Sequence, residues 1–145
     1  EQDIFYNIEY SGLDLAGNRY ILKANEATTD KSNQDIINMK STTAIFYFKD
    51  GTVLNISSET GVYNNKSLDM LFSGEVKASY IESKLFADEA EYSNSKGFLT
   101  ITKNVIIEDS RGNMIADELL FDIKKQTLKI AAFKDNKINA NINLK

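Results

Sequence analysis

Four short acidic motifs repeat along the chain, and their glutamates are the residues whose type and spacing first suggest chemistry. The motifs occupy residues 23–27, 57–61, 87–91 and 116–120, and they align on Glu26, Glu59, Glu89 and Glu118. Carboxylates act as general acid and base when two unlike environments push their pKa values apart. Four copies at one repeat position share one environment, so we expect outward polar positions next to turns and no catalytic role.

The other side chains give little support to catalysis or metal binding. The chain has no His, which is the commonest general base, and no Cys, which excludes thiol nucleophiles and zinc–thiolate sites. Serine is abundant, but without His only a Ser–Lys dyad stays open, and no residue pair singles one out. Asp88-Glu89 and Asp117-Glu118 lack the single loop of about six to eight oxygens that calcium needs. We therefore predict no enzymatic activity, no metal and no cofactor.

The spacing of the motifs indicates a stack of similar units. Their glutamates lie 33, 30 and 29 residues apart, and the unit between them reads as strand, polar turn, strand, polar turn. One such unit cannot bury its own apolar side, so we expect the copies to stack into a single all-β domain over residues 1–145. A net charge of −4 without a stripe of Lys or Arg argues against nucleic acid as a partner.

Alternation of apolar and polar residues predicts strands almost throughout and gives little support to helices. It is clearest over residues 68–80, where one face carries Leu68, Met70, Phe72, Gly74, Val76, Ala78 and Tyr80. Turn-forming residues precede the four repeats at 17–18, 50–51, 83–84 and 111–113. The alternation changes parity between Met39 and Ala44, which predicts a bulge near residues 41–43.

Several segments, taken in order, match the pattern of a known family. They are Tyr10-Ser11-Gly12-Leu13-Asp14, Gly17-Asn18-Arg19-Tyr20, Ala24-Asn25-Glu26-Ala27, Gly61-Val62-Tyr63, Leu71-Phe72-Ser73-Gly74-Glu75-Val76 and Lys103-Asn104-Val105. In this order and spacing they resemble the LptC-like periplasmic domains of the LptA/LptC/OstA-like lipopolysaccharide transport family, from about Ile8 to about Phe133. Asn104 departs from the pattern, because a Gly is often found there.

The resemblance implies a twisted, open β-jellyroll built from the four strand-turn-strand repeats, with lipid acyl chains held in an apolar groove. The candidate lipid-binding groove consists of Phe46, Phe48, Met70, Phe72, Val76, Ala78, Tyr80, Val105 and Ile107. Alternation alone favours an ordinary closed core at these positions, whereas the resemblance favours a groove that is part core and part lipid site. Small residues leave volume that close packing would fill, namely Gly74, Ala78, and Ala24, Ala87 and Ala116 at the repeat position.

The resemblance also implies partners and a location. It implies lipopolysaccharide as the ligand, an LptB–LptF–LptG transporter that supplies it, and an LptA-like protein that receives it. The location implied is the periplasmic face of the inner membrane, with a single-pass anchor in the full-length protein. Residues 4–10 read as a leading strand or a mobile arm, and residues 138–144 as a last strand. The expected edge-strand residues are Ile8 and Tyr10 toward the transporter, and Ile138, Ala140 and Ile142 toward the LptA-like protein. Two alternatives stay open: an LptA-like soluble bridge, and a non-lipid structural or adhesion module of β-repeats.

Overall fold

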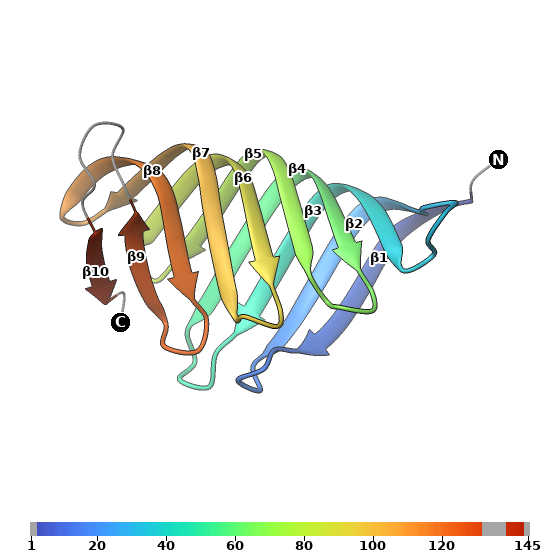
Figure 1. Cartoon of the computed structure of the whole chain (residues 1–145), viewed down its shortest axis with the longest axis horizontal. Coiled ribbons are helices and arrows are strands. Elements are labelled where there is room, and N and C mark those ends of the chain that lie inside the picture. The colour runs from blue at the N-terminus through green and yellow to red at the C-terminus, as the bar shows by residue number, and fades with distance from the viewer. Residues whose placement is uncertain (1–2, 132–138, 144–145) are drawn as a thin grey trace.

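In the part of the chain that the structure describes, ten antiparallel strands form one sheet in which neighbours in sequence are neighbours in space (Figure 1). The computed structural model describes residues 3–131 and 139–143. The strands are β1 (Ile4–Leu13), β2 (Arg19–Thr29), β3 (Ile36–Tyr47), β4 (Val53–Asn64), β5 (Met70–Tyr80), β6 (Ser83–Ser93), β7 (Phe98–Asp109), β8 (Gly112–Asp122), β9 (Thr127–Ala131) and β10 (Asn139–Asn143). These ranges contain no helix, and β1 and β10 form the two opposite edges of the sheet. The predicted all-β class and the open, jellyroll-like sheet are confirmed.

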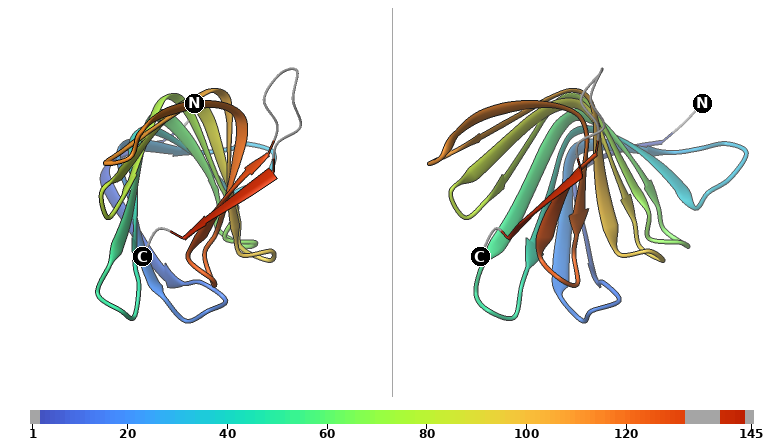
Figure 2. Two further views of the ribbon diagram at one scale, coloured as in Figure 1. Left: turned by 90° about the vertical axis from the view of Figure 1, so that its left-hand side faces the viewer. Right: turned by 60° about the vertical axis from the view of Figure 1, so that its left-hand side comes forward.

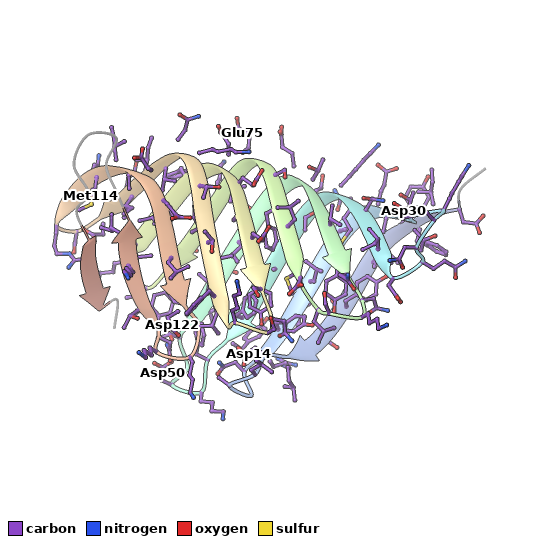
Figure 3. The ribbon with its side chains drawn as sticks, viewed as in Figure 1. Asp14, Asp30, Asp50, Glu75, Met114 and Asp122 are labelled. Carbon is purple, nitrogen blue, oxygen red and sulfur yellow. The ribbon has the colours of Figure 1, made fainter. Side chains whose placement is uncertain are left out.

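The strands from β2 to β8 bend near their middles, and each bend interrupts the alternation of side chains. On β2 the buried positions step from Ala24 to Ala27, so that Asn25 and Glu26 both lie on the outside. On β5 and β7 three residues instead of two separate the buried positions on either side of the bend, and the backbone takes positive φ at positions such as Gly74 (φ 82°). The bends align from strand to strand and form what we call the ridge, residues 25–26, 40–41, 59–60, 73–75, 88–89, 102–104 and 117–118. Glu75 marks its outer side in Figure 3.

The ridge divides the sheet into two walls whose inner sides face one another (Figure 2). The first wall ends at turns 14–18, 48–52, 81–82 and 110–111, and the second wall ends at turns 30–35, 65–69, 94–97 and 123–126. We call the line between these two rows of turns the mouth. The walls remain one continuous sheet, because every strand from β2 to β8 contributes to both.

A single core fills the space between the walls and runs from β2 to β9. Aromatic rings from opposite walls contact each other there, with centroids 5.0 Å apart for Phe46 and Tyr92 and 6.3 Å apart for Phe48 and Phe121. Phe46, Tyr92 and Phe121 have no exposed surface. Burial of each such side chain stabilises the fold by roughly 1.5–3 kcal/mol, so packing between walls holds the bend closed.

The repeated glutamates lie on the ridge, in the middle of their strands, and the prediction that they adjoin turns was wrong. The alignment on Glu59 was also wrong by one residue. In the strand register, Glu26 is opposite Lys40, Lys40 is opposite Thr60, Thr60 is opposite Ser73, and Ser73 is opposite Glu89. We call such a row of paired residues across the sheet a rung. Thr60 therefore lies on the same rung as Glu26 and Glu89, and Glu59 precedes it.

Two local predictions also need correction. The parity change near residues 41–43 is present, and Ser41 has φ of 55°, but β3 keeps an unbroken register with both β2 and β4. It is therefore part of the shared bend, while the register shifts lie from β4 onward, for example between Ser57 and Thr60 against β5. The turn before the third repeat is at residues 81–82, because Ser83 and Lys84 already belong to β6 and pair with Tyr80 and Ser79 of β5.

Both terminal segments form strands where the structure describes them. β1 pairs with β2 from Ile4 to Leu13, so the leading strand is correct and the mobile arm is not. β10 pairs with β9, with Ala140 opposite Ile130 and Ile142 opposite Leu128. Ile138 lies outside the described residues.

Candidate functional site

The nine predicted groove residues all lie on the inner side of the walls, and all are buried. Their exposed fractions are 5% or less, and Phe46, Phe72 and Val105 have no exposed surface. Met70 and Phe72 belong to the second wall and the other seven to the first wall or its turn. The structure therefore brings the predicted residues onto one continuous apolar surface between the walls, where each wall covers the residues of the other.

The mouth is closed at its C-terminal end by a buried glutamine that sequence reasoning missed. Gln126, in the turn after β8, donates hydrogen bonds from Nε2 to the Tyr80 hydroxyl at 2.5 Å, Thr52 Oγ1 at 3.2 Å and Asp50 Oδ2 at 3.3 Å. Its acceptors lie in the first wall, whereas its own turn belongs to the second. We call this set of hydrogen bonds the C-terminal clasp. The ring of Phe121 packs on Tyr80 beneath it, with centroids 5.3 Å apart.

Tyrosines close the mouth nearer its N-terminal end. The hydroxyls of Tyr20 in the first wall and Tyr63 in the second lie 3.0 Å apart, a contact that we call the N-terminal clasp. The ring of Tyr10 contacts that of Tyr63 in a tilted arrangement with centroids 5.1 Å apart, and the Tyr92 hydroxyl donates to Asn94 Oδ1 at 2.8 Å. Burial raises the pKa of Tyr20, Tyr63 and Tyr92 above the ordinary value for a phenol, and all three are neutral hydrogen-bonding groups near neutral pH.

The small residues of the repeat line the inside of the bend. Ala24, Ala87 and Ala116 are buried on the inside of the bend, where they pair with the larger Thr42, Val76 and Val105 of neighbouring strands. Gly74 lies on the ridge. A glycine is required there, because φ is 82° and a Cβ would lie 2.5 Å from Glu59 Oε1. The positive φ and this close contact therefore explain the glycine at residue 74, which the sequence pattern suggested as space for lipid.

The ridge carries the carboxylates that first suggested chemistry. Lys103 Nζ pairs with Glu89 Oε2 at 3.1 Å, and Asn104 Nδ2 donates to Asp88 Oδ2 at 2.6 Å. Each of these is an exposed contact between neighbouring strands. Within the residues that the structure describes, no three acidic side chains converge as a metal site.

The outer surface also has depressions. One of about 340 Å³ lies beside the ridge, where Ile4 and Val62 contribute apolar side chains. It belongs to the outside of the second wall, because Ile4 pairs with Thr28, a position that alternates with the buried Ala27. It is therefore separate from the predicted groove.

The two edges of the sheet differ in character. On β1, Ile8 and Tyr10 are half-buried and pack against the core. At the opposite edge, β9 pairs only with the second half of β8, so residues 112–117 have no neighbouring strand on that side among the described residues. Ile115 in this segment is 68% exposed. The first wall therefore ends at β8 and the second at β10, which the sequence did not predict.

Comparison with known proteins adds one match. A family model described as "Lipopolysaccharide-assembly, LptC-related" matches residues 4–132, which includes β1 to β9. No curated protein matches the chain. In the part of the chain that the structure describes, no helix is long and apolar enough to cross a membrane.

Proposed function

The chain belongs to the LptC-related family of lipopolysaccharide-assembly proteins, and we propose that it carries lipopolysaccharide through the space between its two walls. The observation that supports this most directly is the continuous apolar inner surface of an open sheet that ends in two edges. In the proposed transfer, acyl chains displace the contacts between the walls and occupy the groove that includes Phe46, Phe72 and Val105.

The proposed role is passive transfer. Each methylene group that leaves water contributes about 0.8 kcal/mol, so a multi-chain lipid would bind too tightly to move unless the next carrier offers a similar gain. The chain would accept lipid from an LptB–LptF–LptG transporter at its N-terminal edge, near Ile8 and Tyr10. It would pass the lipid to an LptA-like protein at its C-terminal edge, at the periplasmic face of the inner membrane. A single-pass anchor in the full-length protein would hold it there.

Photo-crosslinking to purified lipopolysaccharide tests the inner surface. A photoreactive side chain at Phe72, which is fully buried between the walls, is expected to label lipid. The matched control is the neighbouring Leu71, which is apolar but only half-buried and alternates onto the outer side. Labelling at Leu71 without labelling at Phe72 would contradict a lipid site between the walls.

A structural or adhesion module with a permanently closed core is the second candidate. The complete burial of the predicted groove favours it, because close-packed interiors leave no room for a ligand. If neither Phe72 nor any other inner position labels lipid while the fold is intact, this alternative replaces the carrier. An LptA-like soluble bridge differs from an LptC-like carrier in its N-terminal segment, which the full-length gene would settle.

Removal of the last strand tests the partner edge. A chain truncated before Ile138 lacks β10 and is expected to lose binding to the LptA-like protein, because main-chain hydrogen bonds of an edge strand supply the affinity. Lipid loading from the transporter should persist. The matched variant Ile115→Lys alters the separate edge of β8, where it adds a charge that discourages strand pairing. Loss of partner binding in Ile115→Lys alone would move the interface to the first wall.

A further inference from the structure

The C-terminal clasp is built from one side chain that reaches across the mouth. Gln126 is 8% exposed, yet its three acceptors lie 46, 74 and 76 residues away in the sequence. Figure 3 labels Asp50, in turn 48–52, and Asp122, which precedes turn 123–126; these are the two turns that Gln126 joins. The clasp therefore ties the end of the second wall to the end of the first.

The C-terminal clasp is held less firmly than the N-terminal one. Tyr20 and Tyr63 are 0% and 2% exposed, and both belong to long strands paired on both sides. Gln126 instead sits in the turn of a hairpin with five paired positions, between β8 and β9, and its φ is 53°. A non-glycine residue in this left-handed region is conformationally strained. Its acceptor Asp50 is exposed, so water can replace that hydrogen bond when the turn moves.

The side chains directly beneath this clasp belong to the apolar inner surface. Phe48, Tyr80 and Phe121 form a triangle of rings with centroids 5.3 to 6.3 Å apart. Phe48 and Tyr80 are members of the proposed groove, and Tyr80 is also the nearest acceptor of Gln126. Loss of the clasp would therefore expose apolar surface that continues into the core.

We infer that the clasp is a gate, and that acyl chains enter and leave the interior between turns 48–52 and 123–126. This inference rests on the proposed function, because it specifies the route by which lipid reaches the inner surface. With Gln126 in place the mouth is shut and the rings are dry. When the turn after β8 swings outward, the ring triangle becomes the first apolar contact for a chain.

A reversible bridge across the mouth tests the gate. The chain has no Cys, so the pair Thr52→Cys and Gln126→Cys gives two unique thiols, which a short reducible crosslinker can join. The readout is the rate at which fluorescent, purified lipopolysaccharide is taken up. The bridged protein is expected to load at least tenfold more slowly than the unbridged pair, and reduction should restore the rate. Gln126→Ala is expected to load faster than the wild type.

The matched control places the same bridge within one wall. The Asn65 main-chain N–H donates to the Asp35 carbonyl oxygen at 2.8 Å, and both residues lie at turns of the second wall. The pair Asp35→Cys and Asn65→Cys, once bridged, should leave the rate unchanged. Equal uptake by the protein bridged across the mouth overturns the gate and leaves the carrier function standing. Faster uptake in Tyr63→Phe but not in Gln126→Ala overturns the location. Absence of uptake by the wild type overturns both the proposed function and the gate.

Discussion

The inner corner of the bend predicts a specific coupling between Gly61 and Thr42. A Cβ added at Gly61 would lie 2.7 Å from Thr42 Oγ1, 2.9 Å from Cγ2 and 3.2 Å from Cβ. The threonine is 1% exposed, and its short branched side chain cannot swing away without colliding elsewhere. Overpacking of this kind costs about 1–3 kcal/mol, so Gly61→Ala should lower the free energy of unfolding by that amount.

The rest of the rung shows that alanine suits the bend itself. The paired positions along it include Ala27 on β2 and Ala90 on β6, and both are buried. Thr42 is therefore the specific obstacle to a side chain at residue 61. Its Oγ1 is buried without a hydrogen-bond partner among the residues that the structure describes, which carries a penalty of about 1–3 kcal/mol.

Thr42→Ala should therefore rescue Gly61→Ala. Alone, Thr42→Ala relieves the hydroxyl's penalty of about 1–3 kcal/mol and loses one methyl group worth about 0.8 kcal/mol, so it should be as stable as the wild type or up to about 2 kcal/mol more stable. Combined with Gly61→Ala it removes the two closest contacts, and the pair should show a favourable coupling of about 1 kcal/mol or more.

Urea unfolding of the four proteins, followed by circular dichroism, measures this coupling. Thr42→Ser is the control, since it keeps the hydroxyl and should rescue less than Thr42→Ala. A coupling below about 0.5 kcal/mol, within the range of independent sites, would refute the argument that the walls meet at this corner.

Three further predictions concern other parts of the molecule. Tyr20, Tyr63 and Tyr92 have raised pKa values in the folded state, so their contribution to stability is intact below about pH 10 and falls as the pH rises above it. Above that pH, each tyrosine should lower the free energy of unfolding by up to about 1.4 kcal/mol per pH unit. Urea unfolding between pH 8 and 11 measures this decrease. Glu89→Gln loses only a surface ion pair and should change lipopolysaccharide uptake less than tenfold; a larger loss with the fold intact would indicate a functional carboxylate. Ile81, at φ of 55° and 51% exposed, strains the β5–β6 turn, so Ile81→Asn should stabilise the protein by about 1 kcal/mol in thermal unfolding, and destabilisation would mean that the isoleucine packs usefully.

Side-chain alternation was enough to place most strands. It predicted the inner face of β5 through Phe72, Val76 and Tyr80, and all three are buried. It also predicted a terminal strand, which the structure describes over Asn139–Asn143. These features are local, because a strand with one buried side needs apolar residues at every second position. The repeat followed for a related reason, since each hairpin must present the same inner side to the stack.

The bend and the clasps depended on contacts between distant segments. The sequence aligned Glu59 with Glu26, but hydrogen-bond register across β3 places Thr60 on that rung. A single strand does not reveal where its alternation will break, because the break must match those of its neighbours. Gln126 gave no signal either, since a polar residue in a turn ordinarily faces solvent. Folding of the sheet along the ridge brought its amide to Tyr80, and only packing between the two walls could determine that meeting.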